Sequence, residues 1–253
     1  MSGHSKWSTI KRKKGAEDAK RGKIFTRLVR EIVTAVREGG GITDPDSNPR
    51  LRIAVEKAKA ANMPKDNIQR AINKGAGISE TGEAYQEITY EGYGPGGVAI
   101  IVETMTDNTN RTLAEVKHAF NRSGGNLASS GAVLWQFDQK GYIEINAEGV
   151  DFDELFLQAA EAGAEDVEAE EDIIVVYTPR TELHNVVKAL QDAGYEIADS
   201  KLAWIPQNEV EVSTEEALQV FKLIEKLEEL DDVQNVSSNL KFTAEAMQAF
   251  EAE

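Results

Sequence analysis

The sequence predicts an α+β protein of several domains: an N-terminal three-helix domain followed by two α/β domains, of which the last is ferredoxin-like (βαββαβ) and inserted in the middle one. Apolar residues before Gly77 recur at helical spacing, whereas the apolar runs after it are short and strand-like. From residue 140 the expected elements follow the order β-α-β-β-α-β. A last helix and strand then need a sheet to pack on, which the segment before residue 138 can provide. The expected domains are residues 1–78, residues 79–138 plus 206–253, and the insertion 139–205.

Three helices are expected in the first domain. Residues 17–38 carry apolar side chains every three or four positions, and glycines at 39–41 end the pattern. Asn48-Pro49 is typical of a helix cap followed by proline at the first helical position, which predicts a helix over 49–62. Pro64 opens the third helix, and Gly75 and Gly77 end it.

The middle domain is expected to begin with a hairpin of strands over 87–93 and 98–106. The glycine-rich segment 92–97 between them resembles a phosphate loop, but a strand follows it and no Gly-Lys-Ser/Thr occurs, so a hairpin turn is favoured. Thr112 and Glu115 have capping-box spacing, which predicts a helix over 111–123, and a strand is expected at 133–137.

The inserted domain and the end of the chain continue this alternation. Strands are expected at 142–145, 167–169, 173–177 and 196–205, with helices at 152–162 and 181–193. Ser213 and Glu216 form a second capping-box pattern before a long apolar helix, and residues 233–237 predict a final strand.

Charge is distributed very unevenly along the chain. The formal net charge is −16, yet residues 1–74 hold 18 Lys/Arg and 8 Asp/Glu, whereas residues 75–253 hold 10 and 36. The two parts therefore carry +10 and −26. Cations concentrated along one surface bind phosphates by releasing condensed counterions, so the basic part predicts a nucleic-acid partner.

The candidate nucleic-acid contacts lie mainly in the first thirty residues. They are Lys6, Trp7, Lys11, Arg12, Lys13, Lys14, Lys20, Arg21, Lys23, Arg27 and Arg30, joined by Arg111. Lys20, Lys23, Arg27 and Arg30 are expected on the helix face opposite the apolar one. Trp7 can stack on a base, but packing against the helical bundle is favoured. A helix-turn-helix is not expected, because the loop 39–48 is too long for its tight turn.

Residues 107–111 follow an expected strand at an expected helix start, where free N–H groups suit an anion. Asp, Asn and Thr are equally typical of helix caps, and capping is favoured, with Arg111 left exposed. The acidic clusters 165–172 and 228–232 are interpreted as solvated surface. They can also repel nucleic acid so that only the basic part docks, or meet basic proteins such as those of a ribosome.

Several classes of protein are excluded or disfavoured. With no cysteine, the chain has no disulfide, thiol nucleophile or Cys zinc site, and its three histidines lack metal spacing. No set of residues resembles a catalytic motif, so neither an enzyme nor a cofactor or metal is expected. We expect a cytoplasmic location, because no signal-peptide h-region or run of about 18 apolar residues occurs.

Ordered motifs along the whole chain resemble the YebC/PmpR family. They are Gly3-His-Ser-Lys-Trp7, Asp18-Ala-Lys-Arg-Gly-Lys-Ile-Phe-Thr26, Asn48-Pro-Arg-Leu-Arg52, Asn62-Met-Pro-Lys-Asp-Asn67, Tyr90-Glu-Gly-Tyr-Gly-Pro-Gly-Gly97, Asn110-Arg-Thr112 and Gly124-Gly-Asn126. The chain departs from that pattern at Thr109, where many members have arginine, and at Ile42-Thr43, which lengthens a loop. Thr109 removes one cation from the anion site considered above.

The resemblance implies three domains, the third inserted in the second, and a cytoplasmic regulator of gene expression without known catalysis. Members are commonly described as probable transcriptional regulators that bind DNA, while others resemble translation factors, as does a mitochondrial translational activator. We therefore expect a nucleic-acid-binding regulator, in the first place a DNA-binding transcriptional regulator that docks its basic helical domain on phosphates. The alternative is a ribosome-associated translation factor that binds ribosomal RNA. A protein partner of the acidic domains is a further alternative, and no membrane partner is expected.

Overall fold

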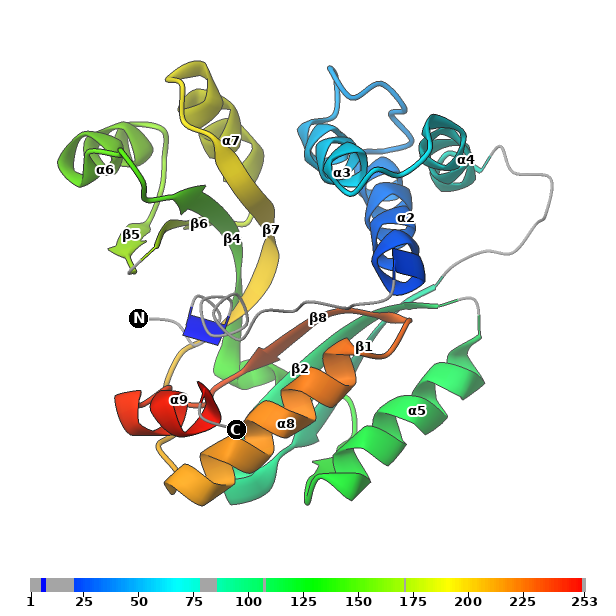
Figure 1. The fold of residues 1–253 in the computed structure, drawn as a ribbon, viewed down its shortest axis with the longest axis vertical. Helices are drawn as coiled ribbons and strands as arrows, with labels where there is room; N and C mark the ends of the chain where they lie inside the picture. The colour runs from blue at the N-terminus through cyan, green and yellow to red at the C-terminus, as the bar shows by residue number, and fades with distance from the viewer. Residues whose placement is uncertain (1–5, 8–20, 78–85, 107, 171, 252–253) are drawn as a thin grey trace. The chain divides into compact units, whose positions relative to one another are not determined.

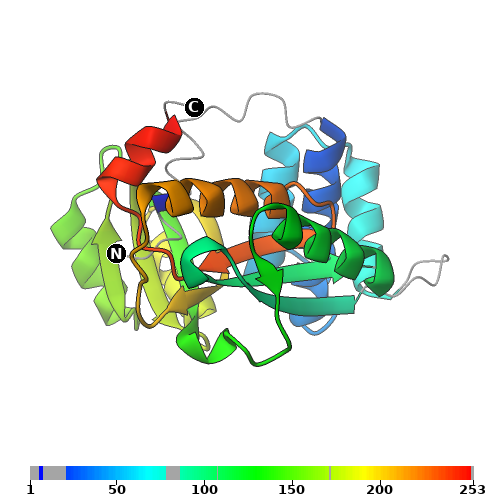
Figure 2. The ribbon, with the colours of Figure 1, turned by 90° about the horizontal axis from the view of Figure 1, so that it is seen from below.

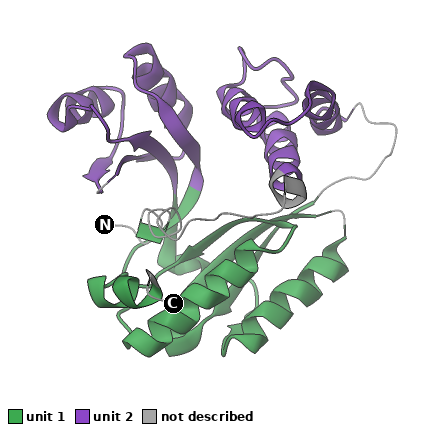
Figure 3. Ribbon diagram, viewed as in Figure 1, with its two compact units in different colours: residues 1–16, 84–139, 203–253 green, residues 17–83, 140–202 purple. Residues whose placement is uncertain are grey.

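The computed structural model describes residues 6–7, 21–77, 86–106, 108–170 and 172–251, with the backbone alone at 21–24 and 251. It forms two compact units (Figure 3), each assembled from segments that are distant in the sequence. Unit 1 comprises Met1–Ala16, Ala84–Gln139 and Ala203–Glu253; unit 2 comprises Glu17–Glu83 and Lys140–Leu202. In the described residues, no helix is both long and apolar enough to span a membrane. The predicted α+β class is confirmed.

The first part of unit 2 is a bundle of three helices (Figure 1): α2 (Arg21–Glu38), α3 (Pro49–Ala60) and α4 (Lys65–Gly75). Asn48 caps α3 as predicted, since its side chain accepts a hydrogen bond from the Leu51 amide at 3.1 Å. The same side chain donates to the carbonyl oxygens of Ala35 and Ile42, at 2.9 and 3.2 Å. One residue thus caps α3 and joins it to α2 and to the connecting loop.

The second part of unit 2 is the ferredoxin-like domain, with strands β4 (Phe137–Asn146), β5 (Asp166–Ala169), β6 (Ile173–Pro179) and β7 (Ile197–Pro206) and helices α6 (Phe152–Glu161) and α7 (Leu183–Asp192). The first residues of β4 and the last residues of β7 belong to unit 1. The sheet order is β5-β6-β4-β7, and β6 pairs antiparallel with both β4 and β5. The predicted βαββαβ order is therefore correct. Ile143, Ile145 and Val176 pack against both helices, and Ile53 from α3 joins this core.

Unit 1 is built on the sheet β3-β1-β2-β8, which consists of β3 (Asn126–Leu127), β1 (Gln86–Tyr93), β2 (Ala99–Thr106) and β8 (Val233–Ser238). Helices α5 (Thr109–Arg122) and α8 (Thr214–Glu228) cover one face (Figures 1 and 2). Strand β2 is buried on both faces: Ile100 and Val102 face the helices, while Ala99 and Ile101 pack against Val133 and Phe137. Pairing of β8 with β2 shows that the chain returns to this sheet after the insertion.

The hairpin between β1 and β2 was predicted correctly, and it turns through a short 3₁₀ helix, η1 (Pro95–Gly97). Gly96 and Gly97 have φ of 68° and 75°, in the left-handed region that favours glycine. The capping box of α8 is also present, with Ser213 and Glu216 bonded reciprocally.

Three expectations for unit 1 are wrong or incomplete. Asn108, not Thr112, caps α5, because the Thr112 hydroxyl instead bonds to the buried side chain of Asp232. Residues 134–136 form a second 3₁₀ helix, η2 (Leu134–Gln136), where a strand was expected, and β4 begins only at Phe137. The helix α9 (Ala244–Glu251) was not predicted; Ala246 and Phe250 bury its inner face.

An ion-pair cluster joins α3 of the bundle to β7 of the ferredoxin-like domain. Lys57 on α3 forms ion pairs with Asp199 on β7 and with Glu31 on α2, and Lys201 lies 3.5 Å from Asp199. Burial alone would raise the pKa of Asp199, but the charges and hydrogen bonds of Lys201 and Lys57 lower it to about 2. The carboxylate is therefore a source of stability within unit 2.

The lowered pKa of Asp199 gives this stability a defined pH dependence. Its contribution is complete above the ordinary pKa of 3.8 and is lost as the pH falls through about 2. We expect Asp199→Asn to lower the free energy of unfolding of unit 2 by about 2 kcal/mol at pH 5–7. The difference from the unsubstituted protein should shrink as the pH falls below about 4.

Thermal unfolding by calorimetry at pH 7, 5 and 3 measures this difference. Asp192→Asn, near the end of α7, is the matched control and should follow the unsubstituted protein at each pH. A constant deficit of Asp199→Asn down to pH 3 would mean that Asp199 stabilises through packing rather than charge.

Candidate nucleic-acid interface

Much of the predicted basic segment lies outside the described residues. Lys11, Arg12, Lys13, Lys14 and Lys20 are among these, as are the side chains of Arg21 and Lys23. The structure places Lys6, Trp7, Arg27, Arg30 and Arg111, and it does not bring them together. They divide between the two compact units, with Arg27 and Arg30 in unit 2.

Trp7 is buried, with 5% of its surface exposed, as the packing interpretation requires. Its partners are not those of the helical bundle, however. The indole stacks on Phe221 at a centroid separation of 5.7 Å and contacts Phe242 and Phe250, all in unit 1. Its Nε1 donates to Glu228 at 3.2 Å, and Lys6 Nζ donates to the Phe242 carbonyl oxygen at 3.3 Å. Trp7 therefore contributes to a hydrophobic core and offers no stacking surface in this structure.

Arg30 does not belong to an exposed stripe on α2. Only 6% of its surface is exposed, while Arg27, one turn earlier, is half-buried. The prediction assumed that α2 buries a single face. All five residues at 32–36 are instead buried, because α2 is the helix against which both α3 and α4 pack.

Arg111 is partly exposed, as predicted, but it is committed to an internal network. Its Nη2 lies 2.7 Å from the carboxylate of Asp232, whose side chain is 1% exposed. The same oxygen accepts hydrogen bonds from Thr106 and Thr112, at 3.0 and 2.6 Å. At the start of α5, the carboxylate of Asp232 therefore occupies Arg111, the cation of the anion site that the sequence suggested. The favoured alternative, a helix cap, is present and is formed by Asn108.

The most accessible cationic surface of the described bundle lies on α4. Lys65 and Arg70 are exposed there together with Gln69, while Ile68, Ala71 and Ile72 bury the opposite face. Gln69 donates to the Asn73 side chain at 3.0 Å. Lys59 at the end of α3 is exposed as well, and neither it nor Lys65 or Arg70 has an ion-pair partner among the residues that the structure describes.

The connection from α3 to α4 has the length of the turn in a helix-turn-helix, a motif that the length of the loop 39–48 had not led us to expect. Only four residues, 61–64, separate the two helices. Asn62 ends α3 with φ of 59°, and the Met63 amide bonds back to the Ala58 carbonyl at 2.9 Å. The exposed Lys65, Gln69 and Arg70 on the second helix are of the side-chain types that contact phosphates and base edges in DNA-binding proteins. The signal was present in the sequence as Asn62-Met63-Pro64.

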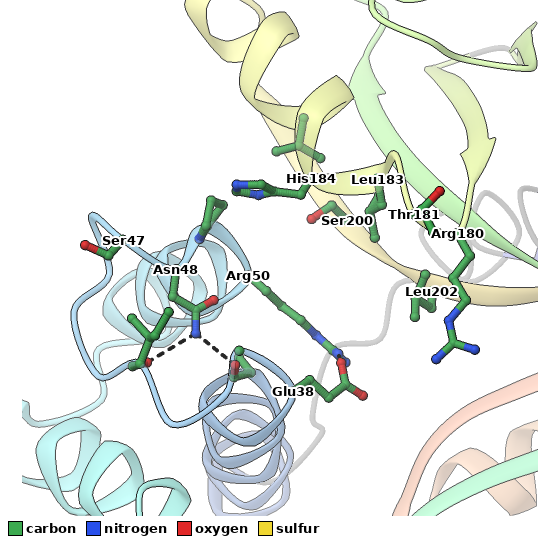
Figure 4. Close-up of a pocket in the computed structure, with 15 residues that line it drawn as sticks. Glu38, Ser47, Asn48, Arg50, Arg180, Thr181, Leu183, His184, Ser200 and Leu202 are labelled. Carbon is green, nitrogen blue, oxygen red and sulfur yellow. Dashed lines mark hydrogen bonds and ion pairs between the residues drawn. The ribbon is translucent and has the colours of Figure 1, made fainter.

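Unit 2 also contains a pocket of about 380 Å³ between the loop that precedes α3 and the start of α7 (Figure 4). Apolar walls come from Ile42, Leu183 and Leu202, and polar groups come from Asn48, Arg50, Arg180 and His184. Arg50 is paired with Glu38 at its edge. The pocket has the size of a small-molecule site. Across the described ranges, no group of three or more His, Asp or Glu is placed to hold a metal ion.

The Asp232 network makes a prediction about stability. We expect Asp232→Ala to lower the free energy of unfolding of unit 1 by about 2–3 kcal/mol, because the Thr106 and Thr112 hydroxyls lose a charged acceptor and Arg111 loses its counterion. The loss stays moderate because the Arg111 side chain is 44% exposed and can be hydrated.

Urea denaturation followed by circular dichroism measures this effect. The neighbouring Asp231→Ala removes the same charge from an exposed position and should change stability by less than about 0.5 kcal/mol. Equal losses from the two substitutions would show that the network contributes nothing beyond net charge.

Family models match nearly the whole chain. The model described as "TACO1/YebC protein N-terminal domain" matches residues 5–78, and "TACO1/YebC second and third domain" matches residues 85–240. Proteins named "Probable transcriptional regulatory protein" from Acidithiobacillus ferrooxidans and Trichlorobacter lovleyi are 56% and 52% identical, over 100% and 98% of this chain and 99% of each relative. A crystal structure of a conserved hypothetical protein from Aquifex aeolicus superposes with a TM-score of 0.81 at 49% identity, covering 89% of this chain and 92% of that one. The chain therefore belongs to the TACO1/YebC family.

Proposed function

We propose that the protein is a nucleic-acid-binding regulator of gene expression that docks its basic helical domain on phosphates, in the first place those of double-stranded DNA. The observation that carries this proposal is the exposed face of α4, with Lys65, Gln69 and Arg70 following a four-residue turn. The regulator names of the relatives support a role of this type.

The charge distribution favours this end of the chain as the docking surface. Residues 75–253 carry 36 Asp/Glu against 10 Lys/Arg, so their net field repels a polyanion. Residues 1–74 carry the opposite net charge. The cations Lys11, Arg12, Lys13, Lys14, Lys20, Arg21, Lys23 and Arg27 remain candidate contacts in addition to those on α4. In this proposal Arg30, Trp7 and Arg111 support the fold, since their side chains already serve internal contacts.

Replacing the α4 cations tests the phosphate contacts. We expect Lys65→Ala/Arg70→Ala to weaken binding to a fluorescent DNA duplex of about 30 base pairs. Between about 50 and 200 mM salt, the slope of log K against log [salt] should become shallower by about 0.9 for each phosphate that is no longer neutralised. Fluorescence anisotropy titrations measure both quantities.

The matched control is Lys117→Ala/Lys188→Ala, which removes two exposed lysines from α5 and α7. It changes the net charge by the same amount and should leave the slope unchanged. If both variants lost the same affinity, the effect of Lys65 and Arg70 would come from net charge alone, and the proposal that α4 contacts phosphates would be contradicted.

Crosslinking in living cells, with sequencing of both bound DNA and bound RNA, distinguishes the nucleic acids. Promoter DNA that disappears on Lys65→Ala/Arg70→Ala substitution supports the transcriptional role. Discrete positions in ribosomal RNA, without promoter DNA, would overturn that role and make the same surface a ribosome-binding one.

A further inference from the structure

Trp135 is the most exposed large hydrophobic side chain in the described part of the chain. It lies in η2 with 70% of its surface accessible, compared with 63% for Leu157 and 43% for Phe156. Exposed tryptophans are costly to hydrate and are enriched among the residues that dominate protein interfaces. The contacts below and around η2 determine how this side chain is presented.

A buried carboxylate holds the turn that precedes Trp135. Glu91 on β1 is 3% exposed and accepts hydrogen bonds from the backbone amides of Gly131, Val133 and Leu134, at 2.5, 2.7 and 2.8 Å. Burial would raise the pKa of Glu91, but these three amides lower it, so the group is ionised at neutral pH. The turn is thus fastened by charge-assisted hydrogen bonds.

Further contacts fix both sides of the turn. Val133 is fully buried against the sheet, and the Tyr93 hydroxyl donates to the Ala132 carbonyl oxygen at 3.1 Å. On the far side of Trp135, the Gln207 amide donates to the Gln136 carbonyl oxygen at 2.8 Å. Trp135 therefore stands on a rigid support, as recognition residues do when a scaffold positions them.

The polar atoms of this site are already used. Trp135 Nε1 donates to the Ala132 carbonyl oxygen at 3.0 Å, so the one polar atom of the indole is already bonded and the ring carbons remain for a partner. The three amides that could have held a phosphate are bound to Glu91. The site is therefore suited to a group that lies on an aromatic face, and unsuited to an external anion.

The charges on the segments that hold the turn are predominantly negative. Asp138 and Glu209 are exposed, and Gln207 bonds to both Asp138 and the backbone of residue 136. The nearby cation Lys241 is paired with Glu211 at 2.7 Å. Asp138 lies three residues after Trp135, and Glu209 lies two residues after Gln207, so these segments attract a cationic partner and repel a nucleic-acid backbone.

We propose that Trp135 is the anchor of a protein-docking surface that receives an arginine- or lysine-bearing segment of a basic partner protein. The guanidinium or ammonium group lies on the indole face, and Asp138 and Glu209 pair with neighbouring cations of the same segment. This surface belongs to unit 1 and the proposed nucleic-acid contacts on α4 belong to unit 2, and the two involve different residues, so either proposal can fail alone.

An octa-arginine peptide with a fluorescent label is the probe, and the full-length protein is titrated at low salt. Trp135→Ala should weaken binding about 2- to 5-fold, the range expected for one exposed cation–π contact, and Trp135→Phe should weaken it less. Leu157→Ala, which truncates another exposed apolar side chain on α6, is the matched control and should not change the affinity. A peptide of eight citrullines keeps the side-chain shape without charge and should not distinguish Trp135→Ala from the unsubstituted protein.

A second variant tests whether Glu91 positions Trp135 by holding the turn that precedes it. Glu91→Gln keeps the shape but loses the carboxylate charge, so the turn should loosen and the affinity for octa-arginine should fall toward that of Trp135→Ala. Equal affinity of all variants for octa-arginine would overturn the proposal. Binding of an octa-uridine strand that depends on Trp135, when octa-arginine binding does not, would also overturn it, because the surface would then stack bases rather than cations.

Discussion

A carboxylate that is buried or half-buried needs donors within the protein, and three such groups, the buried Glu91 and Asp232 and the half-buried Asp199, join distant segments of this acidic chain. Glu91 joins β1 to the turn before η2 through three backbone amides. Asp232 joins the start of β8 to the start of α5 through two threonines and Arg111. Asp199 joins β7 to α3 through Lys57. Each link connects segments 40 or more residues apart in the sequence. Loss of the donors to one of these carboxylates therefore weakens the contact between two distant segments, and the helix or strand propensity of each segment cannot replace that contact.

Local rules predicted the elements well, since each helix end or turn depends on residues that are adjacent in the sequence. Asn48-Pro49, Ser213-Glu216 and the glycines of η1 all behave as their types require. The wrong expectations for Thr112 and for residues 134–136 have one cause, which is a hydrogen-bond partner far away in the sequence. Thr112 is drawn away from capping by Asp232, which is 120 residues distant, and residues 134–136 turn because Glu91 bonds to the amides of Gly131, Val133 and Leu134. Neither partner can be inferred from spacing along the chain.

The candidate site was harder to predict than the fold, because burial decides which cations are available. Arg30 and Trp7 have the chemistry of nucleic-acid contacts, but the all-round packing of α2 buries the first, and an aromatic cluster with Phe221, Phe242 and Phe250 buries the second. Conversely, Lys65 and Arg70 stood in a sequence of ordinary helical composition and gained significance only from the short turn before α4 and the burial of Ile68 and Ile72.

The same internal carboxylates restrict where an external anion can bind. A helix start and a turn with several free amides are the backbone geometries that ordinarily hold phosphates, and both occur in unit 1. At the first, Asp232 pairs with Arg111, so the cation that could help to hold an anion there already has a counterion. At the second, Glu91 accepts the hydrogen bonds of the Gly131, Val133 and Leu134 amides. The proposed phosphate contacts therefore depend on cationic side chains elsewhere. The exposed cations of the described bundle lie on α3 and α4, whereas the exposed Trp135 of η2 is followed by the exposed carboxylate of Asp138, so the two proposed surfaces would select partners of opposite charge.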